Sequence, residues 1–319
     1  MKKPLSIYVH IPFCEKKCPY CDFLSRTDAS DADKAAYIDG LCAEITAARA
    51  PSHIIQTIYF GGGTPSYIDA AHIARVLAAI RGAFDVSRDA EISIECNPNS
   101  VTREKLLSYR KSGVNRISIG IQSFSNKTLK TLERVHNAKQ ARTAIKASCE
   151  IFDNVSIDLI HSIRSRKPKL PRKYLKLVTH VSVYGLTMDD EPQVSDKKSI
   201  REQTKIERIL AKNGLLKYEV SNFARAGAQS RHNLVYWRCG EWLGFGEGAK
   251  SHFQKPWTDD DRIMLGLRLV EGIDLKLLDG KKREVARLIA GGFFESTDGN
   301  VFCTQRGFFV LNQILARLL

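Results

Sequence analysis

Three cysteines near the start of the chain, Cys14, Cys18 and Cys21, have a spacing that suits an inorganic cluster. They stand in a loop directly after an apolar segment at residues 5–10. An electron-transfer cluster has four cysteine ligands, and a structural zinc site usually has a fourth Cys or His. Three thiolates would hold three irons of a 4Fe-4S cluster and leave the fourth iron open. The spacing therefore indicates a cluster with one iron free to bind a small molecule.

Two simpler interpretations of these cysteines remain open. They could be unliganded thiols in an apolar loop, or they could bind zinc together with His10. Lys16 and Lys17 favour an exposed loop in which thiolates form, and this favours the cluster. Thiolate ligands also need a reducing compartment, so the sequence predicts a cytoplasmic protein.

A glycine run forms a second candidate ligand-binding segment. Residues 61–65 read Gly-Gly-Gly-Thr-Pro and directly follow a continuous apolar segment at residues 54–60. Glycines at the carboxyl end of a strand let backbone amides approach a ligand closely, and Thr64 adds a hydroxyl group. By itself the run is more typical of a simple turn. Together with the cysteine loop, it favours a shared binding site.

The hydrophobic pattern predicts strands that alternate with helices. Strands are expected at residues 5–10, 54–60, 90–95, 116–121, 154–160 and 180–187. Helices are expected at residues 31–49, 70–84, 102–112, 125–132, 138–151 and 196–213. Repeated strand-helix units imply an α/β fold with a parallel sheet and right-handed crossovers. A TIM-like barrel, full or partial, is the natural closure of such a sheet.

Polar side chains stand at the ends of three predicted strands: Glu95, Gln122 and Asp158. The carboxyl ends of barrel strands face one mouth, so these side chains should converge on whatever the cysteine loop holds. The two carboxylates could accept hydrogen bonds from hydroxyl or ammonium groups, and Arg134 could pair with a carboxylate. Each of them alone is also consistent with a capping or loop residue.

The cysteine motif resembles the signature of the radical S-adenosylmethionine (SAM) superfamily. Four segments, residues 8–14, 61–65, 116–124 and 232–237, resemble the oxygen-independent coproporphyrinogen III oxidase family. This resemblance covers most of residues 5–253. It implies a partial (β/α)6 TIM-like radical SAM barrel with a family-specific extension over residues 1–253. A small C-terminal helical, winged-helix-like domain would follow over residues 254–319.

The resemblance also implies the cofactors and their ligands. Cys14, Cys18 and Cys21 would bind the 4Fe-4S cluster, and the amino and carboxylate groups of SAM would chelate the open iron. The family's contacts to SAM, carried over position by position, fall on Tyr8, Tyr20, Gly63, Thr64, Glu95, Gln122, Arg134 and Asp158.

Residue 23 separates two branches of this family. The oxidases have a further cysteine two positions after the third ligand, whereas this chain has Phe23. The pattern is similar to the HemW-like heme chaperone branch, which implies that heme is bound as cargo and delivered to apoproteins. His232 is then the candidate heme ligand, because heme iron needs an axial donor such as imidazole. A histidine that fixes a loop by hydrogen bonds is the alternative. An oxidase that decarboxylates the propionates of coproporphyrinogen III is the alternative function.

Two stretches depart from the family pattern. The family usually continues Gly-Leu-Pro-Gly-Gln and a full helix after the strand at 154–160, but residues 162–171 contain two prolines and crowded positive charges. These features argue against a long helix, so a shortened crossover is expected. Lys250 stands where chaperone relatives commonly have histidine, and lysine is a poor heme ligand at neutral pH.

Composition constrains the partners only broadly. The chain has 319 residues with 49 Lys and Arg against 35 Asp and Glu, a formal charge of +14. This balance favours anionic partners such as lipid headgroups, nucleic acid or carboxylate-rich small molecules. No appended RNA-binding module and no transmembrane segment are evident, so neither nucleic-acid binding nor membrane insertion is expected. A homodimer and a peripheral place at the membrane stay open.

Overall fold

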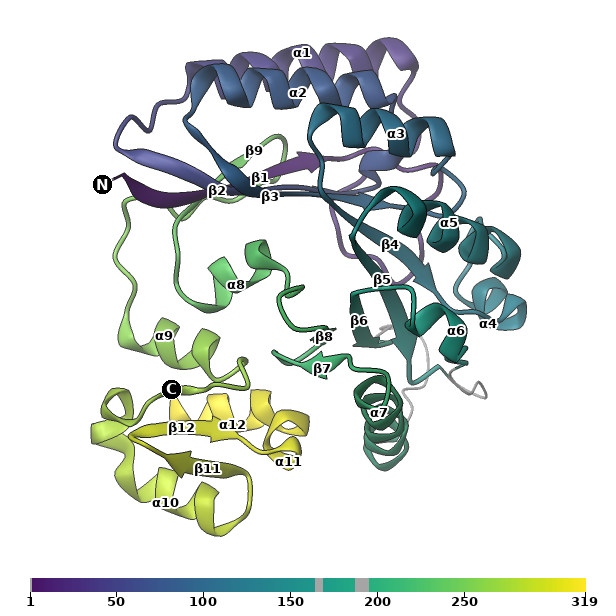
Figure 1. Cartoon of the computed structure of the whole chain (residues 1–319). Coiled ribbons are helices and arrows are strands. Elements are labelled where there is room, and N and C mark those ends of the chain that lie inside the picture. Colours follow the sequence, from purple (N-terminus) through teal and green to yellow (C-terminus); the bar gives the residue numbers. More distant parts are fainter. Residues whose placement is uncertain (1, 164–168, 187–194) are drawn as a thin grey trace.

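The computed structural model describes residues 2–163, 169–186 and 195–319. Its main feature is a curved nine-stranded sheet with the order β7-β8-β6-β5-β4-β3-β2-β1-β9 (Figure 1). Six neighbouring strands run parallel in sequence order: β1 (Lys3–Ile11), β2 (His53–Gly62), β3 (Val86–Cys96), β4 (Arg116–Gln122), β5 (Asn154–His161) and β6 (His180–Gly185). This confirms the predicted partial (β/α)6 barrel.

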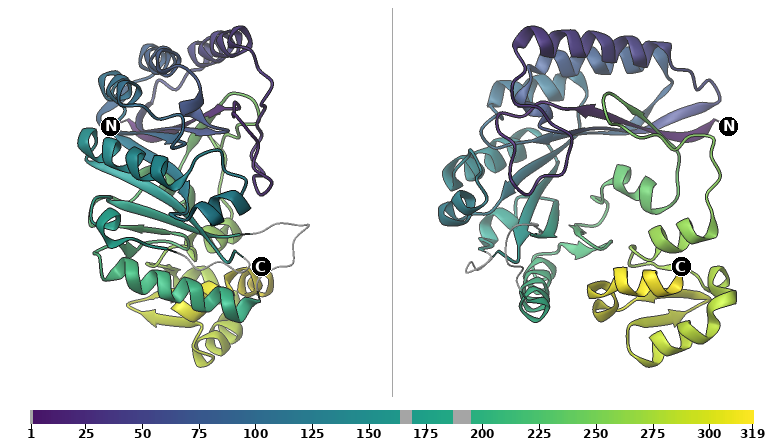
Figure 2. Two further views of the ribbon diagram at one scale, coloured as in Figure 1. Left: turned by 90° about the vertical axis from the view of Figure 1, so that its right-hand side faces the viewer. Right: turned by 180° about the vertical axis from the view of Figure 1, so that it is seen from behind.

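Helices cover the outer face of the sheet in every view (Figure 2). They are α1 (Asp31–Ala47), α2 (Ala70–Ala83), α3 (Arg103–Ser112), α4 (Asn126–Thr131) and α5 (Ala138–Ile151). Capping boxes start two of them: Ser30 with Asp33 begins α1, and Asn137 with Gln140 begins α5. Each box satisfies backbone N–H groups that have no partner inside the helix. Apolar side chains of the helices and strands form one continuous core between these layers.

The crossover between β5 and β6 is short, as predicted. Its described part contains only α6 (Arg172–Leu175), a helix of four residues. Residues 164–168 of this crossover lie outside the described residues. The sequence also predicts a loop at residues 189–192, after the last of the six strands, and these residues lie outside the described part as well. Helix α7 (Asp196–Ala211) follows β6 and packs against the outer side of the barrel.

Three short strands complete the sheet at its two edges. At one edge β7 (Leu216–Lys217) and β8 (Asn222–Ala224) run antiparallel, and β8 pairs with β6. At the other edge β9 (Trp242–Phe245) runs parallel to β1. Helix α8 (Arg231–Trp237) connects these two edges and lies on the inner, concave side of the sheet (Figure 1). The barrel is thus open between β7 and β9, with α8 inside it.

The C-terminal part forms a second hydrophobic core on the opposite side of the molecule from α1 and α2 (Figure 1). Its strands β10 (Ile273–Asp274), β12 (Asn300–Cys303) and β11 (Phe294–Thr297) form an antiparallel sheet in that order. Its α-helices are α9 (Asp259–Gly266), α10 (Lys282–Ala290), α11 (Gln305–Phe309) and α12 (Leu311–Leu318). Contacts to the barrel include the Glu219–Leu269 bridge and the hydrogen bond from Gln305 Nε2 to Glu207 Oε2 at 2.6 Å.

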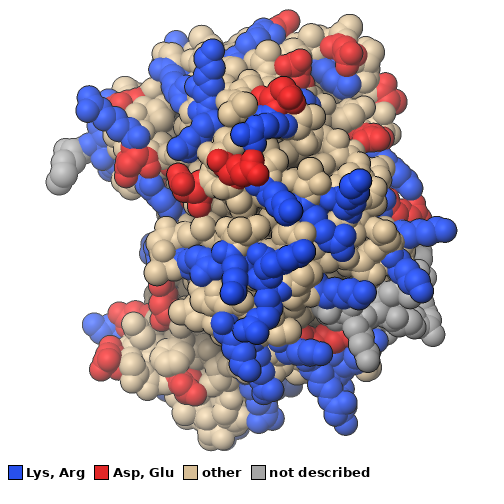
Figure 3. Space-filling model, turned by 45° about the vertical axis from the view of Figure 1, so that its right-hand side comes forward, with Lys and Arg blue, Asp and Glu red and all other residues tan. Residues whose placement is uncertain are grey.

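Positive charge gathers on the side that carries α5, α6 and α7 (Figure 3). The exposed cations of these three helices and of the C-cap of α6 are Lys139, Lys146, Arg172, Lys173, Lys176, Lys197, Lys198, Arg201, Lys205 and Arg208. A surface of one sign attracts partners of the opposite sign. None of the helices in the described part of the chain is both long and apolar enough to span a membrane.

Candidate cofactor site

The cysteine loop leaves the carboxyl end of β1 and is held against the end of β2. Cys14 N donates to Arg26 O at 2.9 Å and Arg26 N donates to Pro12 O at 2.7 Å, which closes the loop at its base. Gly63 N donates to Ile11 O and Thr64 N donates to Phe13 O, each at 2.9 Å. Backbone hydrogen bonds therefore join the cysteine loop and the glycine run into one unit.

Two of the glycines are required by this close approach. Gly62 has a φ of 113°, a conformation that L side chains rarely adopt, and a Cβ there would lie 2.7 Å from the His10 ring. A Cβ on Gly63 would lie 2.9 Å from Phe13 O. Only residues without side chains allow the loop to pack against the strand end this tightly.

A pocket of about 400 Å³ lies at the carboxyl ends of the barrel strands. The three cysteines line it together with seven of the eight residues expected to contact SAM: Tyr20, Gly63, Thr64, Glu95, Gln122, Arg134 and Asp158. These residues come from the cysteine loop, from the ends of β2 to β5, and from the turn after α4. The tertiary structure thus brings together side chains that are up to 144 positions apart in the sequence.

Tyr8 is the expected SAM contact that does not line the pocket. Its ring lies beneath Gly61 and stacks on Tyr59, with ring centroids 6.4 Å apart. Its hydroxyl lies 3.1 Å from Nδ1 of His10, and Nε2 of the same imidazole lies 2.9 Å from Leu24 O. Tyr8 is thereby placed to support the glycine run. Because both His10 nitrogens have partners, the structure does not favour His10 as a zinc ligand.

Arg134 connects the cysteine loop to the barrel. Its Nη1 donates to Cys18 Sγ at 3.3 Å and to the Tyr20 hydroxyl at 3.4 Å. Its Nη2 donates to Gly120 O at 3.0 Å and to Oδ1 of Asn97. Asn97 Nδ2 in turn donates to Thr64 Oγ1 at 3.0 Å. No motif of the sequence points to Asn97, although it stands two positions after Glu95 at a strand end, where a polar residue could be expected to contribute.

The two carboxylates lie deeper in the barrel. Burial raises the pKa of Glu95 to about 7; the hydrogen bond from the Tyr59 hydroxyl to Glu95 Oε1, 2.8 Å long, opposes this rise. Burial also raises the pKa of Asp158, which accepts a hydrogen bond of 3.2 Å from the Ser118 hydroxyl. Both groups can accept hydrogen bonds from a ligand in the pocket. Tyr59 is a second residue that the sequence analysis missed.

The arrangement of the thiols fits a cluster better than a single ion. All three cysteines line the same pocket, and Thr64 Oγ1 lies 3.3 Å from Cys14 Sγ. Within residues 2–163, 169–186 and 195–319, no three Cys, His, Asp or Glu side chains are placed to hold one metal ion. In a 4Fe-4S cluster each thiolate binds a different iron, so its cysteines need not meet at one point. The donor set therefore fits the cluster that the motif predicts.

His232 lies inside the barrel and does not line the pocket. It is 1% exposed, and both ring nitrogens have partners, Thr57 Oγ1 at 2.7 Å and the Tyr236 hydroxyl at 2.8 Å. Heme ligation by His232 would require the ring to leave these partners, and its role in heme binding stays a prediction. Lys250 is exposed and is also absent from the pocket lining.

Comparisons with known proteins agree with this geometry. The model of the radical SAM superfamily matches residues 8–166. Heme chaperone HemW of Escherichia coli (strain K12) is 36% identical over 279 residues, which cover 82% of this chain and 72% of that protein. Heme chaperone HemW of Lactococcus lactis is 35% identical over 375 residues, which cover 100% of this chain and 98% of that protein.

Among solved structures, the radical SAM enzyme coproporphyrinogen III oxidase (HemN) of Escherichia coli has a TM-score of 0.81. The match covers 99% of this chain and 90% of that chain at 22% identity, and it shows that the two share a fold. The chain belongs to the radical SAM superfamily and, within it, to the family of proteins named heme chaperone HemW.

Proposed function

We propose that this protein is a heme chaperone that binds heme, a 4Fe-4S cluster and SAM, and delivers heme to apoproteins. One observation carries the cofactor part: three cysteines and seven residues expected to contact SAM line one pocket. The heme part is supported by the relatives named heme chaperone, which are up to 36% identical to this chain.

In this proposal the cysteines, the arginine and the glutamate of the pocket have separate roles. Cys14, Cys18 and Cys21 hold the cluster, which when reduced supplies one electron to the sulfonium of bound SAM. Arg134 pairs with the carboxylate of SAM, since its guanidinium is fixed at the edge of the cysteine loop. Glu95 accepts hydrogen bonds from ribose hydroxyls or from the ammonium group.

Phe23 supports the chaperone over the oxidase. Its side chain is 61% exposed and lines the pocket, at the position where the oxidases have a cysteine. A turnover assay with coproporphyrinogen III under strict anoxia tests this choice. We expect no protoporphyrinogen beyond background. Formation of protoporphyrinogen over many turnovers would contradict heme carriage as the sole function.

An anaerobic titration with heme, monitored by optical spectroscopy, tests whether the protein binds and carries heme. The reconstituted protein should show a Soret band that saturates at a fixed ratio of heme to chain, and heme should pass to an added apoprotein. Protein with a complete cluster that binds no heme would refute the proposal. The same titration of His232→Ala examines the ligand: a shifted or weakened band indicates ligation by His232, and an unchanged band assigns the iron to another group.

A further inference from the structure

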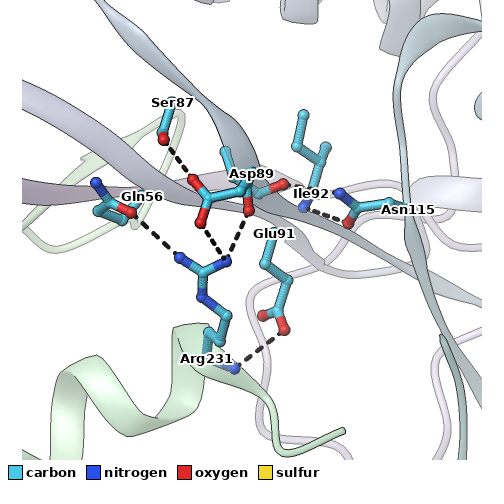
Figure 4. Close-up of polar contacts among 8 residues, drawn as sticks. Gln56, Ser87, Asp89, Glu91, Ile92, Asn115 and Arg231 are labelled. Atoms are coloured by element: carbon cyan, nitrogen blue, oxygen red, sulfur yellow. Dashed lines mark hydrogen bonds and ion pairs between the residues drawn. The ribbon is translucent and has the colours of Figure 1, made fainter. Parts of the chain in front are cut away.

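Helix α8 is fixed to the inner side of the barrel at its first two residues. Figure 4 shows the contacts of the first, Arg231. The Glu91 carboxylate on β3 accepts hydrogen bonds of 3.1 Å from the backbone N–H groups of Arg231 and His232. The Arg231 guanidinium donates to Asp89 O at 2.7 Å and to Gln56 Oε1 at 3.2 Å. These contacts to β2 and β3 determine where the His232 side chain enters the barrel.

Hydrogen bonds on both sides then fix the plane of the His232 ring. The Thr57 hydroxyl donates to Ser6 Oγ at 2.8 Å, so Nδ1 of His232 must carry the proton that it shares with Thr57. Nε2 is then the acceptor for the Tyr236 hydroxyl. Burial lowers the pKa of His232 to about 3, which keeps the imidazole neutral and so leaves Nε2 able to accept this hydrogen bond.

The fixed ring lies against Tyr59. The two ring centroids are 5.1 Å apart with an interplanar angle of 25°, a stacked arrangement. The Tyr59 ring also stacks on Tyr8. Tyr59 thus packs against two rings, and its hydroxyl donates to Oε1 of Glu95 in the pocket. A rotation of Tyr59 about its side-chain bonds would break this hydrogen bond.

We propose that His232 is a positioning residue of the SAM site, which holds Tyr59 so that its hydroxyl orients the Glu95 carboxylate toward bound SAM. This inference rests on the proposed binding of SAM at the pocket. It assigns to His232 a role that needs no contact with iron. It also accounts for the hydrogen bonds that both ring nitrogens of His232 make inside the barrel. One of these is to Thr57, which stands 175 positions earlier in the sequence.

A double-mutant cycle on SAM affinity tests the proposal. The dissociation constant of SAM is measured by equilibrium dialysis on anaerobically reconstituted wild type, Tyr59→Phe, His232→Ala and the double variant. Iron and sulfide contents are compared in parallel. Tyr59→Phe should weaken SAM binding roughly tenfold, because it removes a hydrogen bond to a carboxylate. His232→Ala should weaken it to a similar extent through the loosened Tyr59 ring.

The double variant is the decisive measurement. If His232 acts through the Tyr59 hydroxyl, the double variant binds SAM as Tyr59→Phe does, because the second change has nothing left to disturb. Two effects that multiply, or wild-type affinity in His232→Ala, would overturn the proposal. Wild-type protein that carries the cluster yet binds no SAM would instead refute the proposed cofactor site.

Two further variants separate positioning from general loss of stability. Val285→Ala removes a buried side chain from the C-terminal core, far from the pocket, and should lower the melting temperature without changing SAM affinity. His232→Gln can still donate to Thr57 but lacks the stacked ring. It should weaken SAM binding as His232→Ala does, and it replaces that variant in the cycle if the alanine protein does not fold.

Discussion

The Cα of Gly63 approaches the cysteine loop so closely that a Cβ on this residue would lie 3.0 Å from the Sγ of Cys14. The same Cβ would lie 2.9 Å from Phe13 O. Because backbone atoms of the loop cannot move aside as the end of a side chain can, this contact couples the glycine run to the position of the first cluster cysteine.

Gly63→Ala should therefore displace Cys14 and reduce cluster binding. Forcing an extra carbon into so tight a contact costs about 1–3 kcal/mol. We expect less than half of the wild-type iron and sulfide after anaerobic reconstitution. Gly40→Ala, in α1, is the matched control, since apart from its chain neighbours and the backbone of its own helix no atom lies within 4 Å of the added carbon. It should keep the full cluster, and a Gly63→Ala protein with wild-type iron would contradict the prediction.

Each cluster cysteine should be indispensable. Cys14→Ala, Cys18→Ala and Cys21→Ala should each lose the cluster, measured as iron and sulfide per chain and by the visible absorbance of the reconstituted protein. No other cysteine lines the pocket among the described residues except Cys96, which is 3% exposed and lies at the end of β3. Cys149→Ala, in α5, should leave cluster content unchanged. One cluster-cysteine variant with full content would show that the ligand assignment is wrong.

Glu219 should make stability depend on pH. It is fully buried between the barrel edge and Leu269, and burial raises its pKa from 4.5 to about 7. The native state thus keeps a proton that the unfolded state releases above pH 4.5, so stability falls as pH rises toward 7. Between pH 5 and pH 8 the wild type should lose about 2.5 kcal/mol relative to Glu219→Gln.

Urea unfolding of wild type and Glu219→Gln at the two pH values measures this difference directly. Comparing the two proteins cancels the contribution of other groups that titrate in the same range. The exposed Glu295, on β11, provides a matched substitution, and Glu295→Gln should follow the wild-type curve. A difference between wild type and Glu219→Gln that stays constant with pH would mean that Glu219 is ionised in the native state throughout.

Asn97 should support SAM binding through Arg134. Its amide joins the Arg134 guanidinium to the Thr64 hydroxyl, and Asn97→Ala leaves the guanidinium with fewer partners at the pocket edge. SAM affinity should fall roughly tenfold, as expected when a hydrogen bond to a charged group is lost. Asn115→Ala removes hydrogen bonds to the backbone of β3 in the middle of the strand, at Ala90 and Ile92. That variant should lose stability but keep SAM affinity, and equal affinities for both variants would refute the role of Asn97.

Local patterns in the sequence predicted most of the elements. The strands at the barrel core appear close to their expected positions, because buried parallel strands are continuous apolar runs. In the C-terminal part, the sequence pattern predicts a helix at residues 262–270. The helix found there spans Asp259–Gly266, because the Thr258–Asp261 capping box starts it earlier. The short strands β7, β8 and β9 were not predicted, since two to four residues carry too little periodicity to be recognised.

The sequence by itself predicted the cluster ligands and determined the glycine run and the alternation of strands and helices, since spacing and periodicity are properties of neighbouring residues. It also indicated the family, through motifs that the comparisons bear out. Only the tertiary structure decided that His232 is buried against Tyr59 and that Asn97 joins Thr64 to Arg134. These relationships depend on packing and hydrogen bonds between distant segments, and such contacts have no signature in local sequence.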